Sequence, residues 1–135
     1  MAIYIIQASL ENLKNVREWL QSTLDTFDID KRASFQVVTA VNEVVTNVIV
    51  HTHRENPTKK VGIKVDPCGD GVRVEILDFC PECEVKIVEQ EGSVESESGF
   101  GLRIVRSLVD HFEHRKVESG NLFILVKYAC SRVRS

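Results

Sequence analysis

Apolar residues recur every three or four positions in two long segments near the N-terminus, which predicts two helices. The first segment runs from Leu10 to Phe27 and follows Ser9, whose hydroxyl suits a helix N-cap. The second covers 31–52, follows Asp30 as its cap, and is rich in valine. Valine has modest helix propensity, but this segment is far longer than a strand and its polar residues do not alternate. We therefore expect a second helix that is largely buried.

Shorter segments in which apolar and polar residues alternate predict five strands. They cover 3–8, 61–66, 72–77, 112–117 and 122–128. Turn-forming residues at 67–71 and 119–121 join two pairs of these strands into hairpins. A third helix is expected over 102–109, after an acidic, polar stretch at 78–98 that is long enough to be a functional lid. This order predicts an α+β two-layer sandwich, in which a mixed but mainly antiparallel sheet carries helices on one face.

Length and charge limit the classes of function. The 135 residues suffice for a single domain (1–135) with its own core. Seventeen Lys and Arg against twenty Asp and Glu give a net charge of −3, which argues against binding to nucleic acids or anionic membranes. No apolar run approaches the ~20 residues that span a bilayer, and the N-terminus lacks the basic start of a signal peptide. We expect a cytoplasmic protein that contacts neither nucleic acid nor membrane.

The chain has four cysteines, and two of them form its single C-x-x-C motif, Cys80 to Cys83. Thiols stay reduced in the cytoplasm, so we expect incidental, reduced cysteines. A structural zinc site would need Cys68 and Cys130 to complete its four ligands. A thioredoxin-type motif would open a helix, whereas the residues after Cys83 are charged and strand-like.

Three groups of residues carry candidate chemistry. Glu43, Asn47 and His51 are four positions apart, which places them on one face of the valine-rich helix. Such a polar stripe indicates either a lined pocket or groups that bond to neighbouring backbone. Asp78 follows a strand, where a carboxylate is also common as a turn residue. The segment from Gly99 to Gly101 precedes a helix, where backbone N–H groups suit a phosphate, although a G-x-G alone is a weak signal.

Taken in order, these groups resemble the motifs of the GHKL (Bergerat-fold) ATPases, which include gyrase and histidine kinases. The chain is most similar to the small bacterial anti-sigma-factor serine/threonine protein kinases of partner-switching systems. Residues 42–51 (NEVVTNVIVH) resemble the N-box of that family, Asp78 begins its first glycine box, and 99–105 (GFGLRIV) resembles its second. The resemblance covers nearly the whole chain and implies the Bergerat ATP-binding fold.

The resemblance also implies a role for each matched residue. Asn47 would coordinate Mg²⁺ through its amide oxygen, and Glu43 would be the catalytic base that accepts the proton of an attacking hydroxyl. Asp78 would accept a hydrogen bond from the exocyclic amine of adenine in ATP. The acidic segment 84–98 would be a lid over the nucleotide. The remaining cofactor-binding residues would be Gly99, Phe100, Gly101, Leu102 and Arg103, and Arg106 would add positive charge near the phosphates.

The implied activity is that of an ATP-dependent protein serine/threonine kinase that is also an anti-sigma factor. Its partners would be a sigma factor and an anti-sigma-factor antagonist, which it would phosphorylate. Members of the family often pair through their sheets, so the resemblance implies a homodimer.

The first glycine box departs from the family pattern at Cys80, where glycine would let the chain pass close to the base. A side chain there narrows the pocket or changes the turn. This departure favours an alternative function, a non-catalytic partner-binding module with weak or no ATP turnover. A third hypothesis is a thiol or metal switch, in which Cys80 and Cys83 gate the binding of ATP.

Overall fold

The computed structural model describes residues 1–88, 100–101 and 103–128 of the chain. Within them the elements follow the order predicted from the sequence, with a short additional strand pair between β3 and α3. The elements are β1 (Ala2–Gln7), η1 (Leu10–Asn12), α1 (Leu13–Leu24), α2 (Lys31–Asn47), η2 (Val48–Thr52), β2 (Lys60–Cys68), β3 (Gly71–Leu77), β4 (Ile87–Val88), β5 (Phe100–Gly101), α3 (Arg103–Leu108), β6 (His111–Val117) and β7 (Gly120–Lys127).

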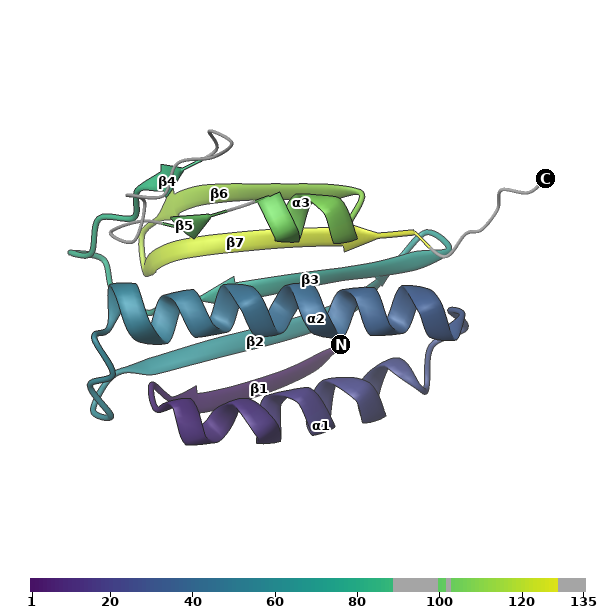
Figure 1. Ribbon diagram of the computed structural model, residues 1–135, viewed down its shortest axis with the longest axis horizontal. Coiled ribbons are helices and arrows are strands. Elements are labelled where there is room, and N and C mark those ends of the chain that lie inside the picture. The colour runs from purple at the N-terminus through teal and green to yellow at the C-terminus, as the bar shows by residue number, and fades with distance from the viewer. Residues whose placement is uncertain (89–99, 102, 129–135) are drawn as a thin grey trace.

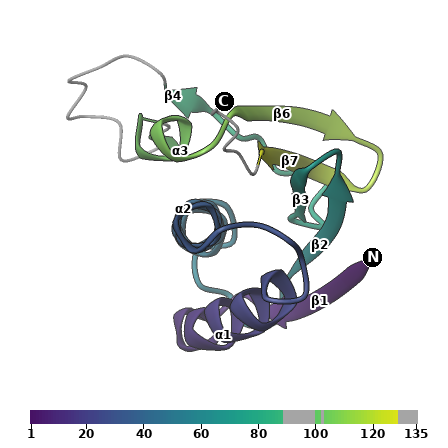
Figure 2. The same ribbon diagram turned by 90° about the vertical axis from the view of Figure 1, so that its right-hand side faces the viewer.

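Five strands form one antiparallel sheet in the order β1-β2-β3-β7-β6. The helices α1, α2 and α3 all lie on one side of this sheet, as Figure 2 shows. The predicted α+β sandwich with helices on one face is therefore confirmed. The only parallel pairing in the described part of the chain is between β4 and β5, which form a separate two-stranded sheet (Figure 1).

The valine-rich segment is helical, as predicted, because its apolar side chains can be buried on most sides. Helix α2 lies between α1 and α3 over the sheet, and its last turn, η2, is a π-helix. Asp30 caps α2 as predicted, since its carboxylate accepts a hydrogen bond from the backbone N–H of Ala33 at 2.7 Å. Contrary to the expectation that no segment approaches membrane-spanning length, 31–52 is long and apolar enough to cross a membrane, and it is the only such helix among the described residues. In this structure it is the central helix of the core.

The start of the first helix differs from the sequence prediction. Ser9 is extended and its side chain makes no capping hydrogen bond. The chain instead turns through the short 3₁₀ helix η1, in which the backbone N–H of Asn12 donates to the carbonyl of Ser9. The α-helical part begins at Leu13 and ends at Leu24, because these tighter turns already pair the first backbone groups.

Both hairpins are tighter than predicted. Strand β2 continues to Cys68 and β3 resumes at Gly71, so only two residues form the loop between them. Likewise, β6 ends at Val117 and β7 begins at Gly120. Glycine permits this second start because the backbone of Gly120 has a φ of +145°, which a side chain disfavours.

Candidate functional site

The predicted site residues gather at one end of the molecule. The C-terminal turns of α2, the end of β3 and the start of β7 meet there, with the β4–β5 pair beside them (Figure 1). Helix α3, which follows β5, packs against α2. The fold therefore brings the N-box helix, Asp78 and the start of the second glycine box to the same end of the sheet.

Glu43, Asn47 and His51 are all half-buried on α2 and η2, as a stripe that borders a cavity or solvent would be. The side-chain amide of Asn47 donates to the backbone carbonyl of Glu43 at 2.9 Å, which fixes its orientation along the helix. Among the described residues, the carboxylate of Glu43 and the amide oxygen of Asn47 accept no hydrogen bond. An amide oxygen is a ligand type that hard cations accept, and a carboxylate without hydrogen bonds is a suitable proton acceptor.

Asp78 is completely buried, with an exposed fraction of 0%. Its Oδ1 accepts hydrogen bonds from the backbone N–H groups of Cys80 at 2.9 Å and Asn121 at 2.8 Å. Its Oδ2 accepts a hydrogen bond from the side-chain amide of Asn121 at 2.9 Å. The carboxylate predicted to bind adenine is therefore enclosed by protein donors.

The environment of Asp78 includes three polar residues that sequence reasoning did not single out. Asn121 is fully buried, and its side-chain oxygen accepts a hydrogen bond from Nε2 of His114 at 2.9 Å. His53, which is 4% exposed, places Nε2 2.9 Å from the backbone carbonyl of Asp78 and 3.1 Å from that of Lys60. Because both neighbours are acceptors, Nε2 of His53 must carry the proton.

Nδ1 of His53 is buried with no hydrogen-bond partner in the described part of the chain. His53 joins the end of η2 to the end of β3, so it connects the N-box helix to Asp78. A polar residue two positions after His51 in a valine-rich segment was the available sequence signal for it.

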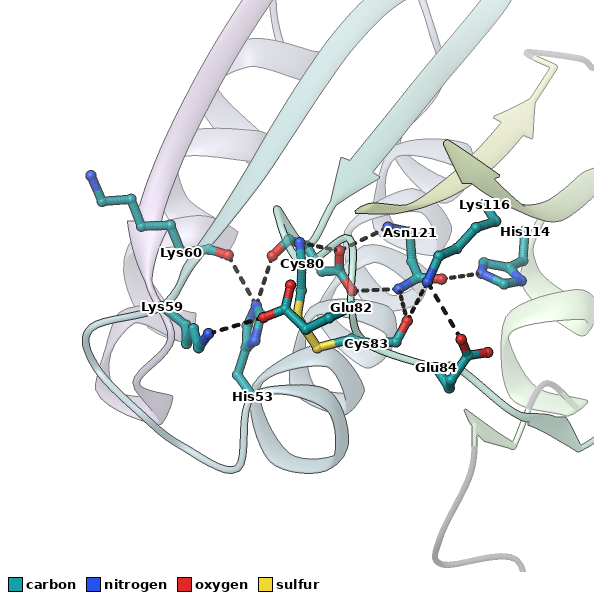
Figure 3. The surroundings of a disulfide bond; sticks show 11 residues. His53, Lys59, Lys60, Cys80, Glu82, Cys83, Glu84, His114, Lys116 and Asn121 are labelled. Atoms are coloured by element: carbon teal, nitrogen blue, oxygen red, sulfur yellow. Dashed lines mark hydrogen bonds and ion pairs between the residues drawn. A yellow bond between two sulfur atoms is a disulfide. The ribbon is translucent and has the colours of Figure 1, made fainter. Parts of the chain in front are cut away.

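Cys80 and Cys83 form a disulfide, so the expectation of two reduced, incidental thiols is wrong for this structure. The bond spans three residues and closes the turn that directly follows Asp78 (Figure 3). Cys80 is buried and Cys83 is half-exposed. The sequence prediction failed because it took the redox state from an expected compartment, whereas the turn itself brings the two cysteines within bonding reach, with 5.3 Å between their Cα atoms.

The carbonyl of Cys83 accepts two hydrogen bonds from the β6–β7 hairpin. One comes from the side-chain amide of Asn121 at 3.0 Å and the other from Nζ of Lys116 at 2.5 Å. Both cysteines of the bridge are thus tied to the network around Asp78, as Figure 3 shows. The first glycine box of the family is replaced here by a cross-linked turn.

The second glycine box falls only partly on described residues. Phe100 and Gly101 form β5, whose backbone pairs with that of β4, while Gly99 and Leu102 lie outside the described residues. Most of the predicted lid, 89–98, lies outside them as well. Arg103 is the first residue of α3 and is exposed.

Arg106 contacts β6, which the sequence did not predict. Its Nη1 donates to the backbone carbonyl of Phe112 at 3.3 Å, and its guanidinium lies 5.5 Å from the centre of the Phe112 ring. No group of three His, Cys, Asp or Glu side chains within the described residues is arranged to hold a metal ion.

Comparison with solved structures identifies proteins of the same fold. The crystal structure of the RsbU and RsbW domains of Rv1364c from Mycobacterium tuberculosis matches 95% of this chain at 17% identity, with a TM-score of 0.64. The histidine kinase domain of the blue-light activated histidine kinase EL346 from Erythrobacter litoralis matches 92% at 16% identity, with a TM-score of 0.53. This chain spans 32% of the first structure and 62% of the second.

No curated protein matches the chain. The model of the histidine kinase-like ATPase domain family, however, matches residues 6–127, which is nearly the whole sequence. This match confirms the resemblance that the N-box and glycine boxes indicated, and it supports a nucleotide-binding, kinase-like role. The chain belongs to the family of histidine kinase-like ATPase domains.

Proposed function

We propose that this chain binds ATP with Mg²⁺ and is a cytoplasmic protein serine/threonine kinase that also acts as an anti-sigma factor. It phosphorylates an anti-sigma-factor antagonist and thereby exchanges that partner for a sigma factor. Family membership supports the nucleotide-binding part of this proposal. The likeness in fold to a structure that contains an RsbW domain is compatible with the partner-switching part.

The observation that carries the proposal is the arrangement of Glu43 and Asn47 on α2. They are one helical turn apart, half-buried, and their side-chain oxygens are not engaged by the described residues. In the proposed reaction the amide oxygen of Asn47 is a ligand of Mg²⁺, which neutralises phosphate charge. The carboxylate of Glu43 orients the attacking hydroxyl of the antagonist and accepts its proton.

A second candidate function is a partner-binding module without ATP turnover. The enclosure of Asp78 favours it, because a carboxylate that already accepts three hydrogen bonds offers little to a base. In this case the chain would sequester a sigma factor or an antagonist through its surface alone.

We also propose that the chain forms a homodimer through the face of the sheet that carries no helix. A mainly apolar groove lies there, lined by Ile3, Ile5, Gly62, Ile63, Leu77, Phe79 and Leu122 together with the charged residues Lys64 and Glu75. Ile3 and Ile5 are each more than half exposed, which is costly for a monomer in water. Sedimentation equilibrium should give twice the chain mass at micromolar concentration, and a monomer throughout that range would contradict this.

Titration of Mg²⁺-ATP into the purified protein, followed by a phosphoryl-transfer assay with an antagonist protein, tests the main proposal. Glu43→Gln should retain ATP binding and reduce transfer by about 10²-fold or more, because it removes only the proton acceptor. Asn47→Ala should abolish the difference in ATP affinity with and without Mg²⁺.

Glu18→Gln is the matched control for Glu43→Gln, since Glu18 is exposed on α1. Its transfer rate should equal that of the unaltered protein. A folded protein that shows no saturable ATP binding, whether oxidised or reduced, would refute the kinase and support the partner-binding module.

A further inference from the structure

Asn121 occupies Oδ2 of Asp78, the carboxylate that the family resemblance assigns to the adenine of ATP. Its side-chain NH₂ group donates to Oδ2 of Asp78 at 2.9 Å and to the carbonyl of Cys83 at 3.0 Å. An exocyclic adenine amine is also an NH₂ group with two hydrogens to donate. Asn121 and the base therefore compete for one carboxylate oxygen.

The orientation of the Asn121 side chain is fully determined. Both partners of its nitrogen are acceptors, and its oxygen accepts from Nε2 of His114 at 2.9 Å. Its backbone N–H and carbonyl also pair with Asp78 at 2.8 and 3.1 Å. Because Asn121 is fully buried with every polar group satisfied, it does not leave Asp78 without a change in one of these partners.

The disulfide controls two of the groups in this network. Cys80 donates its backbone N–H to Oδ1 of Asp78, and Cys83 supplies the carbonyl that accepts from Asn121. The bridge between them fixes the turn, so both groups keep their positions. Cys80 is buried and Cys83 is partly exposed, so an external thiol would have to approach the bridge from the side of Cys83.

We propose that the Cys80–Cys83 disulfide is a redox-sensitive latch that holds Asn121 on Asp78 and so closes the base-recognition carboxylate. Opening requires a dithiol reductant. It supplies two electrons and two protons, the S–S bond breaks, Cys80 and Cys83 become thiols, and the dithiol becomes a disulfide. The two sulfurs then separate beyond bonding distance, the turn relaxes, and the Cys83 carbonyl moves away from Asn121. Oδ2 of Asp78 becomes available to an incoming amine.

The position of the bridge supports regulation rather than general stabilisation. It closes a turn of only a few residues, so it constrains the unfolded chain much less than a long-range bridge would. Disulfides in reducing compartments are usually transient and either catalytic or redox-sensing. The identity of the competing ligand as ATP and the reducing compartment rest on the proposed function; the link between the bridge and Asn121 does not.

Amide hydrogen exchange tests the latch without a ligand. The N–H groups of Cys80 and Asn121 both bond to Oδ1 of Asp78, so they report directly on this network. Exchange at both should become about tenfold faster or more when the oxidised protein is reduced with dithiothreitol. Equal exchange rates at these two amides in both redox states would overturn the proposal.

Calorimetric titration of Mg²⁺-ATP tests whether opening the disulfide increases the affinity for the nucleotide. The reduced protein should bind about tenfold more tightly than the oxidised protein. A double variant, Cys80→Ser with Cys83→Ser, should bind like the reduced protein and no longer respond to dithiothreitol. Cys68→Ser is the matched control, because Cys68 is a free thiol at the opposite end of β2 and its loss should leave the redox response intact.

The possible outcomes separate the two proposals. Faster exchange on reduction with no ATP binding in either state would support the latch and refute the kinase. Measurable ATP binding that does not change on reduction would refute the latch and leave the kinase. If the double variant does not fold, the comparison of oxidised and reduced unaltered protein gives the same decision.

Discussion

Each end of β7 is hydrogen-bonded to an aspartate. The two aspartates make similar hydrogen bonds but differ in burial, so comparing them shows what burial contributes. At the start of the strand, Asp78 accepts from the backbone N–H of Asn121 at 2.8 Å. At its end, Asp110 accepts from that of Tyr128 at 2.7 Å. Each aspartate also donates its own N–H to a carbonyl of β7. The hydrogen bonds are alike, but Asp78 is fully buried and Asp110 is exposed.

This difference in burial decides what each aspartate contributes. Water can replace Asp110 as a partner of the strand, so its bond adds little to the free energy of unfolding. No water reaches Asp78, and two further donors depend on it, from Cys80 and from the Asn121 side chain. The structural anchor of β7 and the proposed recognition of the base therefore share one carboxylate.

The largest effect on the free energy of unfolding is expected for Asp78→Ala, and Asp110→Ala is the variant to compare it with. Asp78→Ala leaves three buried donors without an acceptor and should lower the free energy of unfolding by about 4 kcal/mol. Asp110→Ala should cost about 1 kcal/mol or less, because water replaces the carboxylate. Urea unfolding of the oxidised proteins measures both, and equal losses would show that burial does not distinguish the two ends.

Two glycines offer a second pair of variants: Gly120 lies at the start of β7, and Gly71 lies beside the end of β7 at Lys127. A Cβ on Gly120 would lie 2.4 Å from Oδ1 of Asp78 and 2.6 Å from the backbone nitrogen of Cys80. A Cβ on Gly71 would lie 2.1 Å from the carbonyl oxygen of Lys127. Neither site has room for a methyl group without a shift of neighbouring atoms.

We expect Gly120→Ala to be the more damaging of the two. It should cost about 3 kcal/mol, because its φ of +145° is strained for alanine and its neighbours are fixed by Asp78 and the disulfide. Gly71→Ala should cost about 1–2 kcal/mol, since β7 ends at Lys127 and can move outward there. Thermal unfolding monitored by circular dichroism gives the melting temperature of each variant. A lower melting temperature for Gly71→Ala than for Gly120→Ala would contradict the expectation that the start of β7, beside Asp78, is the more rigid end.

The same contrast explains which parts of the structure were predictable from the sequence. Helices, strands and hairpins were predicted because their signals are local: the valine-rich helix after Asp30 and the alternation of Val72, Val74 and Ile76 are read within a few residues. Ser9 was assigned wrongly because caps depend on backbone detail. Asp78 was singled out through a family motif, but its environment depends on Asn121, 43 positions away.

No local pattern predicts such a partner. Asn121 looks like an ordinary turn residue in the sequence, and it is buried only because β7 pairs with β3. The same holds for His53, whose role arises from the approach of η2 to the end of β3. In the cysteine motif the spacing was visible, but its redox state depends on how the turn closes.

The smallest effect is expected at Glu113, a partly exposed residue of β6, which pairs with β7. The side chains of Arg115 and His111 both hydrogen-bond to Glu113 and lower its pKa from 4.5 to about 2. A folded pKa below the unfolded one stabilises the protein above pH 4.5, and this contribution disappears as the pH falls through 2. Glu113→Gln should therefore lower the melting temperature slightly at pH 6 and by clearly less at pH 2, where half of the folded carboxyls are already protonated.

The control for this prediction is the Asp110→Ala variant measured at the same two pH values. Asp110 is exposed and Glu113 is partly exposed, so solvent screens both carboxylates and both variants should stay close to the unaltered protein at pH 6. A loss for Glu113→Gln at pH 6 as large as that for Gly71→Ala would mean that a partly exposed carboxylate contributes as much as a buried strand end. Burial would then no longer account for the difference between the two ends of β7.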